Sequence, residues 1–154
     1  MFKKYYLAYG SNLNINEMKN RCIFSKPIGS VILKDYRLVY KGSGNKYSYL
    51  TIEKSEGYYV PLGVYEISIF DIKSLDEYEG YPELYSKSYI SININNKEVN
   101  ALIYIMNEEF DYCLPSKDYI KICKEGYNDF GFDKTILDKA LEDTINNLPK
   151  IKNR

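Results

Sequence analysis

The sequence predicts an α+β protein in which a small mixed β-barrel is flanked by helices. Many short segments alternate apolar with polar residues and are rich in β-branched and aromatic side chains, which is typical of strands. Few helical segments lie between them, which favours a mixed or antiparallel sheet closing toward a barrel over a doubly wound parallel sheet. The 154 residues are the usual size of one domain, and no linker or repeat interrupts them. Residues 1–154 are therefore expected to form a single domain.

The first strand and the turn after it set the start of the fold. The strand is predicted over Lys4–Tyr9 and ends at Gly10. Asn14, with Glu17 three residues later, matches the capping-box pattern and predicts a short helix that ends near Arg21. A strand therefore enters this loop and a helix leaves it.

Further strands are predicted from the same alternation of apolar and polar residues. They are Val31–Tyr40, Ser48–Glu53, Val60–Ile69, Leu84–Ile94 and Glu98–Met106. Asn95 and Asn96 are favoured turn residues. The last two strands are therefore expected to form a hairpin.

Two internal helices are predicted from apolar spacing and from their end signals. Asp71–Glu79 has apolar residues every three positions, and Gly80 occupies the usual C′ position. Its final glutamate is expected in the last helical turn. Ser116 is a good N-cap for a helix through Glu125, which Gly126 would close.

The final helix has the clearest pattern of the chain. Its apolar residues follow the three-four period from Leu137 to Leu148, with Asp133 before them as a cap and Pro149 after them as a stop. A single apolar stripe of this kind indicates a structural helix.

Charge and hydropathy exclude several kinds of partner. Lysine and arginine total 21 and aspartate and glutamate total 21, so no basic excess exists to neutralise phosphates. Nucleic acid is therefore not an expected partner. No run of eighteen apolar residues and no apolar signal-peptide core occurs. A cytoplasmic protein without a membrane partner is the expectation.

Cysteine and histidine usage narrows the chemistry. Cys22, Cys113 and Cys123 form no C-x-x-C pattern, and their odd number argues against a disulfide framework. The chain has no histidine, so a Ser-His-Asp or Cys-His triad lacks its base and zinc lacks its commonest nitrogen ligand. We expect no metal and no cofactor, and carboxylates must carry any proton transfer.

The first candidate site is the turn Tyr9-Gly10-Ser11-Asn12-Leu13. A strand that runs into a glycine turn exposes backbone N–H groups that can converge on a carbonyl or carboxylate. Glycine permits both a positive φ and the close approach of a ligand. The alternative is an ordinary strand-to-helix turn built from favoured turn residues.

The second candidate is the acidic run at the end of the predicted helix, which contains Asp76, Glu77 and Glu79. A solvated helix face is the simplest interpretation. Negative charge at a helix C-terminus opposes the macrodipole, however, and this raises the pKa of a carboxyl group, especially if tyrosines also desolvate it. Glu79 is favoured over its two neighbours because it stands at the corner before Gly80, where a side chain can turn into a cleft.

The third candidate is the segment Pro115-Ser116-Lys117-Asp118-Tyr119. Ser116 has the position of a helix cap, and Tyr119 has that of an inward-facing helix residue. Taken alone, these residues favour a tyrosine packed in the core, whose hydroxyl then needs a hydrogen-bond partner.

Taken in order, the segments Tyr6–Asn12, Leu75–Gly80 and Pro115–Tyr119 with Gly126 resemble the γ-glutamyl cyclotransferase (AIG2-like) family. The resemblance implies a small mixed barrel and the release of 5-oxoproline from a small γ-glutamyl amino acid or amine. It implies that Glu79 is the proton acceptor. The substrate-binding residues that it implies are Tyr6, Leu7, Ala8, Tyr9, Gly10, Ser11, Asn12 and Tyr119.

Several functional alternatives stay open on the sequence. Residues 79–85 are similar to the branch of the family that acts on γ-glutamylamines, whereas residues 115–126 are similar to the branch that acts on γ-glutamyl dipeptides. The leaving group is therefore undecided. A non-catalytic module that binds a small amine or amino acid would use Glu79 as a countercharge. A serine hydrolase using Ser11 ranks last, because Asn14 stands where an S-x-x-K motif needs lysine. Homodimerisation is also open.

Overall fold

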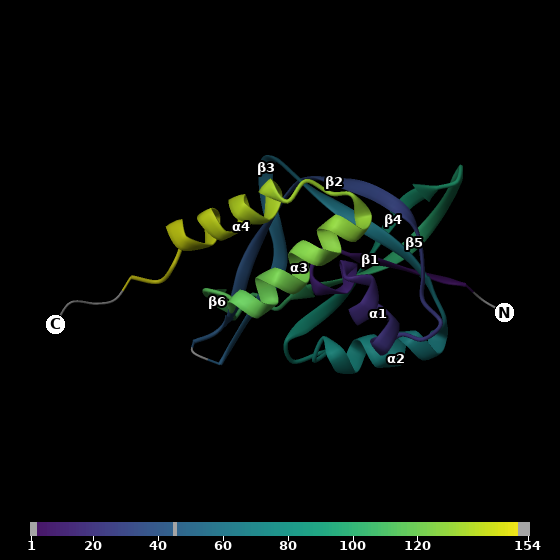
Figure 1. Ribbon diagram of the computed structural model, residues 1–154, viewed down its shortest axis with the longest axis horizontal. Helices are drawn as coiled ribbons and strands as arrows, with labels where there is room; N and C mark the ends of the chain where they lie inside the picture. The colour runs from purple at the N-terminus through teal and green to yellow at the C-terminus, as the bar shows by residue number, and fades with distance from the viewer. Residues whose placement is uncertain (1–2, 45, 151–154) are drawn as a thin grey trace.

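The computed structural model describes residues 3–44 and 46–150 (Figure 1). Its elements are β1 (Lys4–Ala8), η1 (Ser11–Leu13), α1 (Ile15–Arg21), β2 (Lys26–Ser43), β3 (Tyr47–Ile67), α2 (Ile69–Tyr78), β4 (Tyr85–Ile94), β5 (Lys97–Met106), β6 (Asp111–Tyr112), α3 (Lys117–Phe130) and α4 (Thr135–Asn146). Within these residues the strands form one sheet in the order β4-β5-β1-β3-β2-β6. Strands β1 and β5 are parallel, and the other neighbouring pairs are antiparallel.

The sheet curls into a half-barrel with helices around it (Figure 1). Helices α1 and α2 lie together at one end, and α3 passes across the sheet in front of β1. The predicted α+β class, a mixed barrel-like sheet with flanking helices, is confirmed. The single-domain expectation over residues 1–154 stays a prediction, and Met1 and Phe2 lie outside the described residues.

The long hairpin of β2 and β3 replaces three predicted strands. The segments predicted over residues 48–53 and 60–69 belong to one strand that continues through residues 54–59. Lys34 pairs with Tyr59 and Tyr36 with Lys54, so four residues of β3 lie opposite the single residue Asp35. This bulge bends the hairpin. Asp35 has a φ of 63°, and its Oδ1 accepts a hydrogen bond from the Gly57 N–H at 3.0 Å.

The connection from β3 to α2 lies earlier than predicted. Ser68 is the N-cap of α2, and it exchanges hydrogen bonds with Asp71 in a complete capping box. The strand therefore ends at Ile67, and the helix begins at Ile69. Glu79 is the C-cap, one residue beyond the last helical residue, and Gly80 follows with a φ of 62°.

The predicted Asn95–Asn96 turn and the predicted Asn14 cap are confirmed, but the capping box at Asn14 is incomplete. Asn95 and Asn96 have φ values of 51° and 62° and join β4 to β5, as a two-residue hairpin requires. Asn14 Oδ1 accepts from the Glu17 N–H at 3.3 Å. The Glu17 carboxylate does not complete the capping box, because it pairs with Arg21 at 3.2 Å.

Helix α3 continues past the glycine that was predicted to close it. It ends at Phe130, and Gly131 is its C-cap with a φ of 70°. Gly126 lies inside the helix and is buried against the backbone of Leu13 and Asn14. The prediction was wrong because this glycine serves close packing between α3 and the η1 turn, which local sequence does not reveal.

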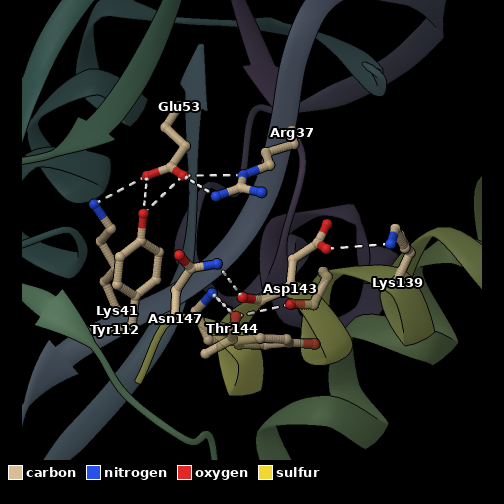
Figure 2. A network of polar contacts seen from close by, with 10 residues as sticks. Arg37, Lys41, Glu53, Tyr112, Lys139, Asp143, Thr144 and Asn147 are labelled. Atoms are coloured by element: carbon tan, nitrogen blue, oxygen red, sulfur yellow. Dashed lines mark hydrogen bonds and ion pairs between the residues drawn. The ribbon is translucent and has the colours of Figure 1, made fainter. Parts of the chain in front are cut away.

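Helix α4 begins at residue 135 and ends at residue 146, two residues before the predicted end. Lys134 occupies the N-cap position, but the carboxylate of Asp133 accepts from the Thr135 N–H at 2.9 Å. The buried Thr144 Oγ1 accepts from the Tyr40 N–H at 2.8 Å (Figure 2). This bond attaches the apolar face of α4 to β2.

A polar cluster holds β6 against the long hairpin (Figure 2). The carboxylate of Glu53 accepts from Arg37 Nη2 at 2.8 Å and from the Tyr112 hydroxyl at 2.9 Å. Lys41 Nζ lies 3.1 Å from the same carboxylate. Burial disfavours the ionised Glu53, but hydrogen bonds from Arg37, Tyr112 and Lys41 outweigh it, and the pKa of Glu53 is lowered. The cluster fixes the strand that leads to α3.

No helix in residues 3–44 and 46–150 has the length and apolar character needed to cross a membrane.

We predict that Gly126→Ala destabilises the protein. An added Cβ would lie 2.5 Å from the Asn14 backbone nitrogen, and backbone atoms cannot rotate away. Gly→Ala inside a helix otherwise gains about 1 kcal/mol, whereas overpacking costs about 1–3 kcal/mol. Urea unfolding should therefore show a net loss of about 1 kcal/mol, and at most about 2 kcal/mol. Lys124→Ala, at an exposed position of the same helix, is the control; a Gly126→Ala variant at least as stable as the wild type would contradict this packing.

Candidate active site

A cavity of about 90 Å³ lies where the β1–η1 turn, β3, the end of α2 and α3 meet. Seven of the residues that line it were predicted from the sequence: Tyr6, Tyr9, Gly10, Ser11, Asn12, Glu79 and Tyr119. Six were not: Tyr49, Leu50, Tyr78, Leu84, Tyr85 and Tyr104. Segments that are far apart in the sequence thus supply one site.

Leu7 and Ala8 do not belong to the wall of this cavity. Both residues are almost fully buried in the hydrophobic core. They pair with Val64 and Gly63 of β3. These two residues therefore support the turn from the core, and their side chains do not line the cavity.

The turn after β1 is a single 3₁₀ turn. The Leu13 N–H donates to the Gly10 carbonyl at 3.0 Å. Gly10 has a φ of −125°, so the turn does not use the positive φ that glycine permits. Glycine is needed here for close approach instead, because a Cβ would lie 3.3 Å from the Tyr119 hydroxyl and 3.4 Å from Leu50 Cβ.

Asn12 connects the turn to the elements around it. Its Nδ2 donates to the Tyr6 hydroxyl at 2.9 Å and to Glu79 Oε1 at 3.3 Å. Arg21 Nη1 donates to its Oδ1 at 2.5 Å. The Tyr65 hydroxyl donates to its backbone carbonyl at 2.7 Å. This side chain is buried, and its bonds place the turn directly beside the Glu79 carboxyl.

Glu79 has the electrostatic character of a proton carrier. Burial raises the pKa of its carboxyl to about 7, and the nearby charge of Arg21 opposes this rise. The sequence predicted a raised pKa from the helix end and from desolvation by tyrosines, and burial is the main physical cause. Near neutral pH both protonation states are then populated, as a general acid/base requires.

The two rival carboxylates are placed differently. Asp76 is engaged away from the cavity, where it accepts from Lys87 Nζ at 2.7 Å and from the Tyr104 hydroxyl at 2.6 Å. Glu77 is exposed to solvent. Neither residue lines the cavity in the described part of the chain. Among the three, Glu79 is the carboxylate that the fold turns inward.

Tyrosine hydroxyls form much of the polar wall. The Tyr119 hydroxyl accepts from the Leu50 N–H at 3.0 Å, and the Tyr85 hydroxyl donates to the Leu50 carbonyl at 2.7 Å. The Tyr78 hydroxyl and Ser11 Oγ are 3.0 Å apart. Burial raises the pKa of Tyr85 and of Tyr119 well above the usual value. These phenols therefore stay neutral near pH 7 and act as hydrogen-bonding groups.

Arg21 and the additional tyrosines were missed for different reasons. The chain contains 18 tyrosines, and nothing in the local sequence distinguishes a cavity tyrosine from a core one. Arg21 is a cation in the last turn of a short helix. Cations are common at ordinary helix ends, so its position did not indicate a role in the site. Among the described residues, no group of three or more His, Cys, Asp or Glu side chains forms a candidate metal-ligand set.

Comparison with known proteins identifies the relatives of this chain. The family model of γ-glutamyl cyclotransferase, AIG2-like proteins matches residues 6–121. A search of curated proteins finds no match.

Several solved structures have a similar fold. One described as a γ-glutamyl cyclotransferase is 23% identical, with a TM-score of 0.76 over 99% of this chain and 92% of that one. A human protein described as uncharacterized is 24% identical, with a TM-score of 0.75 and the same coverage of 99% and 92%. A yeast γ-glutamyl cyclotransferase specific to glutathione is 8% identical, with a TM-score of 0.58 over 92% of this chain and 99% of that one. At these identities the likeness shows the fold alone.

We predict that Glu79 makes the stability of the protein depend on pH. The folded state keeps the Glu79 proton up to about pH 7, whereas the unfolded chain releases it near the ordinary value of 4.5. The stabilising contribution is therefore complete below pH 4.5 and is lost as the pH rises to about 7. Glu79→Gln removes this dependence, so its stability relative to the wild type should rise by up to about 3 kcal/mol between pH 4.5 and 8.

Urea unfolding of both proteins across this pH range measures the effect. Glu77→Gln, on the exposed side of the same helix, is the matched control and should follow the wild type. Parallel pH curves for the wild type and Glu79→Gln would show that the carboxyl is not held in a desolvated site.

Proposed function

The chain belongs to the γ-glutamyl cyclotransferase, AIG2-like family, and on this premise we propose that it converts a γ-glutamyl amino acid or amine into 5-oxoproline and the free amino acid or amine. The family and the fold support a γ-glutamyl cyclotransferase-like function. The observation that carries the proposal is the Glu79 carboxyl in the cavity wall, 3.3 Å from Asn12 Nδ2 of the adjoining turn. A carboxyl group that can carry a proton therefore lies beside a turn whose groups can hydrogen-bond to a substrate.

The proposed reaction is intramolecular. The α-amine of the substrate attacks its own γ-carbonyl carbon, a new N–C bond closes the five-membered ring, and the bond to the departing nitrogen breaks. Neither water nor a covalent enzyme intermediate takes part. Holding the two reacting atoms in attack geometry can supply about 7 kcal/mol or more. A small cavity with fixed hydrogen-bonding walls supports this task.

Glu79 would carry the protons of both steps. As a carboxylate it removes a proton from the α-ammonium group, which frees the nitrogen lone pair for attack. As a carboxylic acid it then returns a proton to the departing nitrogen, which would otherwise leave as a poor amide anion. The carboxylate formed in this step accepts the extra proton of the ring nitrogen and passes it to solvent. A pKa of about 7 favours both directions of transfer near neutral pH.

The turn would hold the glutamyl group and the developing oxyanion. The first N–H groups of a helical turn have no acceptor within that turn, so those of Gly10 and Ser11 are suited to the carbonyl oxygen. Such a donor is worth about 3 kcal/mol in comparable sites. We propose the cavity-lining residues Tyr6, Tyr9, Asn12 and Tyr119 as the remaining contacts of the glutamyl group.

We predict that Glu79→Gln strongly lowers turnover while the fold is kept. Purified wild type and variant are incubated with γ-glutamyl dipeptides and γ-glutamylamines, and 5-oxoproline is measured by mass spectrometry. Because the amide cannot carry the proton, the rate should fall by about 10²–10⁴-fold. Glu77→Gln should behave as the wild type.

The substrate panel also decides between the remaining interpretations. The substrate with the highest kcat/KM identifies the leaving group as an amino acid or an amine. If no member yields 5-oxoproline with the wild type, the proposed reaction on these substrates is wrong. Thermal stabilisation by a panel member without turnover would then favour a binding module.

We also predict the pH dependence of the reaction. Because the free enzyme must hold Glu79 as a carboxylate to accept the ammonium proton, kcat/KM should rise with pH and level off above about 7. Initial rates at low substrate concentration between pH 5 and 8 measure this rise in kcat/KM. A rate that does not change with pH over this interval would contradict the assignment of Glu79 as the base.

A further inference from the structure

We propose that Arg21 is a positioning residue that fixes the orientation of the Asn12 side-chain amide and thereby holds Glu79 ready for proton transfer. The inference rests on the proposed function. Its geometric basis is a chain of hydrogen bonds from Arg21 Nη1 to Asn12 Oδ1 at 2.5 Å and from Asn12 Nδ2 to Glu79 Oε1 at 3.3 Å. Arg21 itself is not among the residues that line the cavity.

The amide of an asparagine can be turned over with little change in shape, so its surroundings must select one orientation. Arg21 is a donor with no acceptor, and only Oδ1 of Asn12 can face it. Nδ2 is thereby directed to the other side, where it donates to the Tyr6 hydroxyl at 2.9 Å and to Glu79. Without the guanidinium, the amide loses the donor that faces Oδ1, and the bonds from Nδ2 to Tyr6 and Glu79 are left to hold this orientation.

The orientation of the amide matters to the ionised state of Glu79. An N–H donor favours a carboxylate, whereas a carbonyl oxygen in the same place would repel it. The positive charge of Arg21 acts in the same direction and lowers the pKa of Glu79 against the effect of burial. Arg21 therefore supports the base form of the carboxyl in two ways, through the amide and through its own charge.

Arg21 is itself held in place. Its guanidinium carbon lies 3.6 Å from the centre of the Tyr78 ring, and its Nη2 lies 3.2 Å from Glu17 Oε1. The Arg21 side chain is 16% exposed and that of Glu17 is 34% exposed. The planar fork thus contacts an amide, a carboxylate and an aromatic face at once, which a lysine cannot reproduce.

The other groups around Glu79 carry little uncompensated charge. Tyr6, Tyr78, Tyr85, Tyr104 and Tyr119 contribute phenols from β1, α2, β4, β5 and α3, and burial raises the pKa of each of these phenols. Asp76 of α2 is paired with Lys87 of β4 at 2.7 Å. Glu17 partly offsets Arg21 within α1. Removing Glu17 should therefore strengthen the lowering of the Glu79 pKa by Arg21, and removing Arg21 should abolish this lowering.

The experiment compares Arg21→Met, Arg21→Lys and Glu17→Gln with the wild type. The pH profile of kcat/KM is recorded with the best γ-glutamyl substrate, and the Glu79 carboxyl is titrated by ¹³C NMR, with Glu79→Gln used to assign its signal. In Arg21→Met we expect the titration of Glu79 to move to higher pH. For a rise of one pKa unit, kcat/KM should fall about fivefold more at pH 6 than at pH 8. Arg21→Lys should restore part of this loss, and Glu17→Gln should move the titration to lower pH.

Lys19→Met removes an exposed cation from the same helix and should leave both readouts as in the wild type. A purely structural role for Arg21 would lower kcat/KM equally at all pH values and leave the titration of folded protein unchanged, which would overturn the inference. The NMR titration needs no turnover, so it tests Arg21 even if no substrate is found. If 5-oxoproline forms but the Glu79 titration is the same in Arg21→Met, the proposed function stands and this inference fails.

Discussion

The buried side chain of Asn12 must satisfy hydrogen bonds on several sides, and the arrangement of the site follows from this constraint. An unpaired buried amide group costs about 1–3 kcal/mol, so Asn12 is stable only when β1, α1 and the end of α2 lie around it together. Tyr6, Arg21 and Glu79 supply these partners. The same bonds that remove an unfavourable polar group from the core place the turn against the carboxyl. Stability and the geometry of the site therefore have one cause.

Burial also decides the chemistry of the cavity. Protein atoms around Glu79 disfavour its charged form and bring its pKa to about 7, while the neighbouring phenols are kept neutral by the same desolvation. Seven tyrosines line the cavity: Tyr6, Tyr9, Tyr49, Tyr78, Tyr85, Tyr104 and Tyr119. They supply donors and acceptors without charge. The cavity wall thus holds one titrating carboxyl among neutral polar groups. Arg21 does not line the cavity, and its charge opposes the rise in the pKa of Glu79.

Local signals predicted some elements well and others poorly. The alternation of β4 and β5, the Asn95–Asn96 turn and the Asn14 cap depend on neighbouring residues, and the structure confirms them. Gly126 was assigned to a helix end because glycine is common there, but its place is fixed by contact with a turn more than a hundred residues earlier. The bulge opposite Asp35 depends likewise on pairing between two strands, which neither strand reveals by itself.

The sequence by itself determined the fold class, the family resemblance and the turn at Gly10–Asn12, and it led to the proposal of Glu79, because these depend on short motifs and on the absence of histidine. Only the tertiary structure decided that Leu7 and Ala8 belong to the core and that tyrosines from four distant segments complete the wall. Only the tertiary structure brought Arg21 to Asn12. The physical reason is that burial and hydrogen-bond partnership are properties of side chains brought together by folding, and no spacing along the chain specifies them.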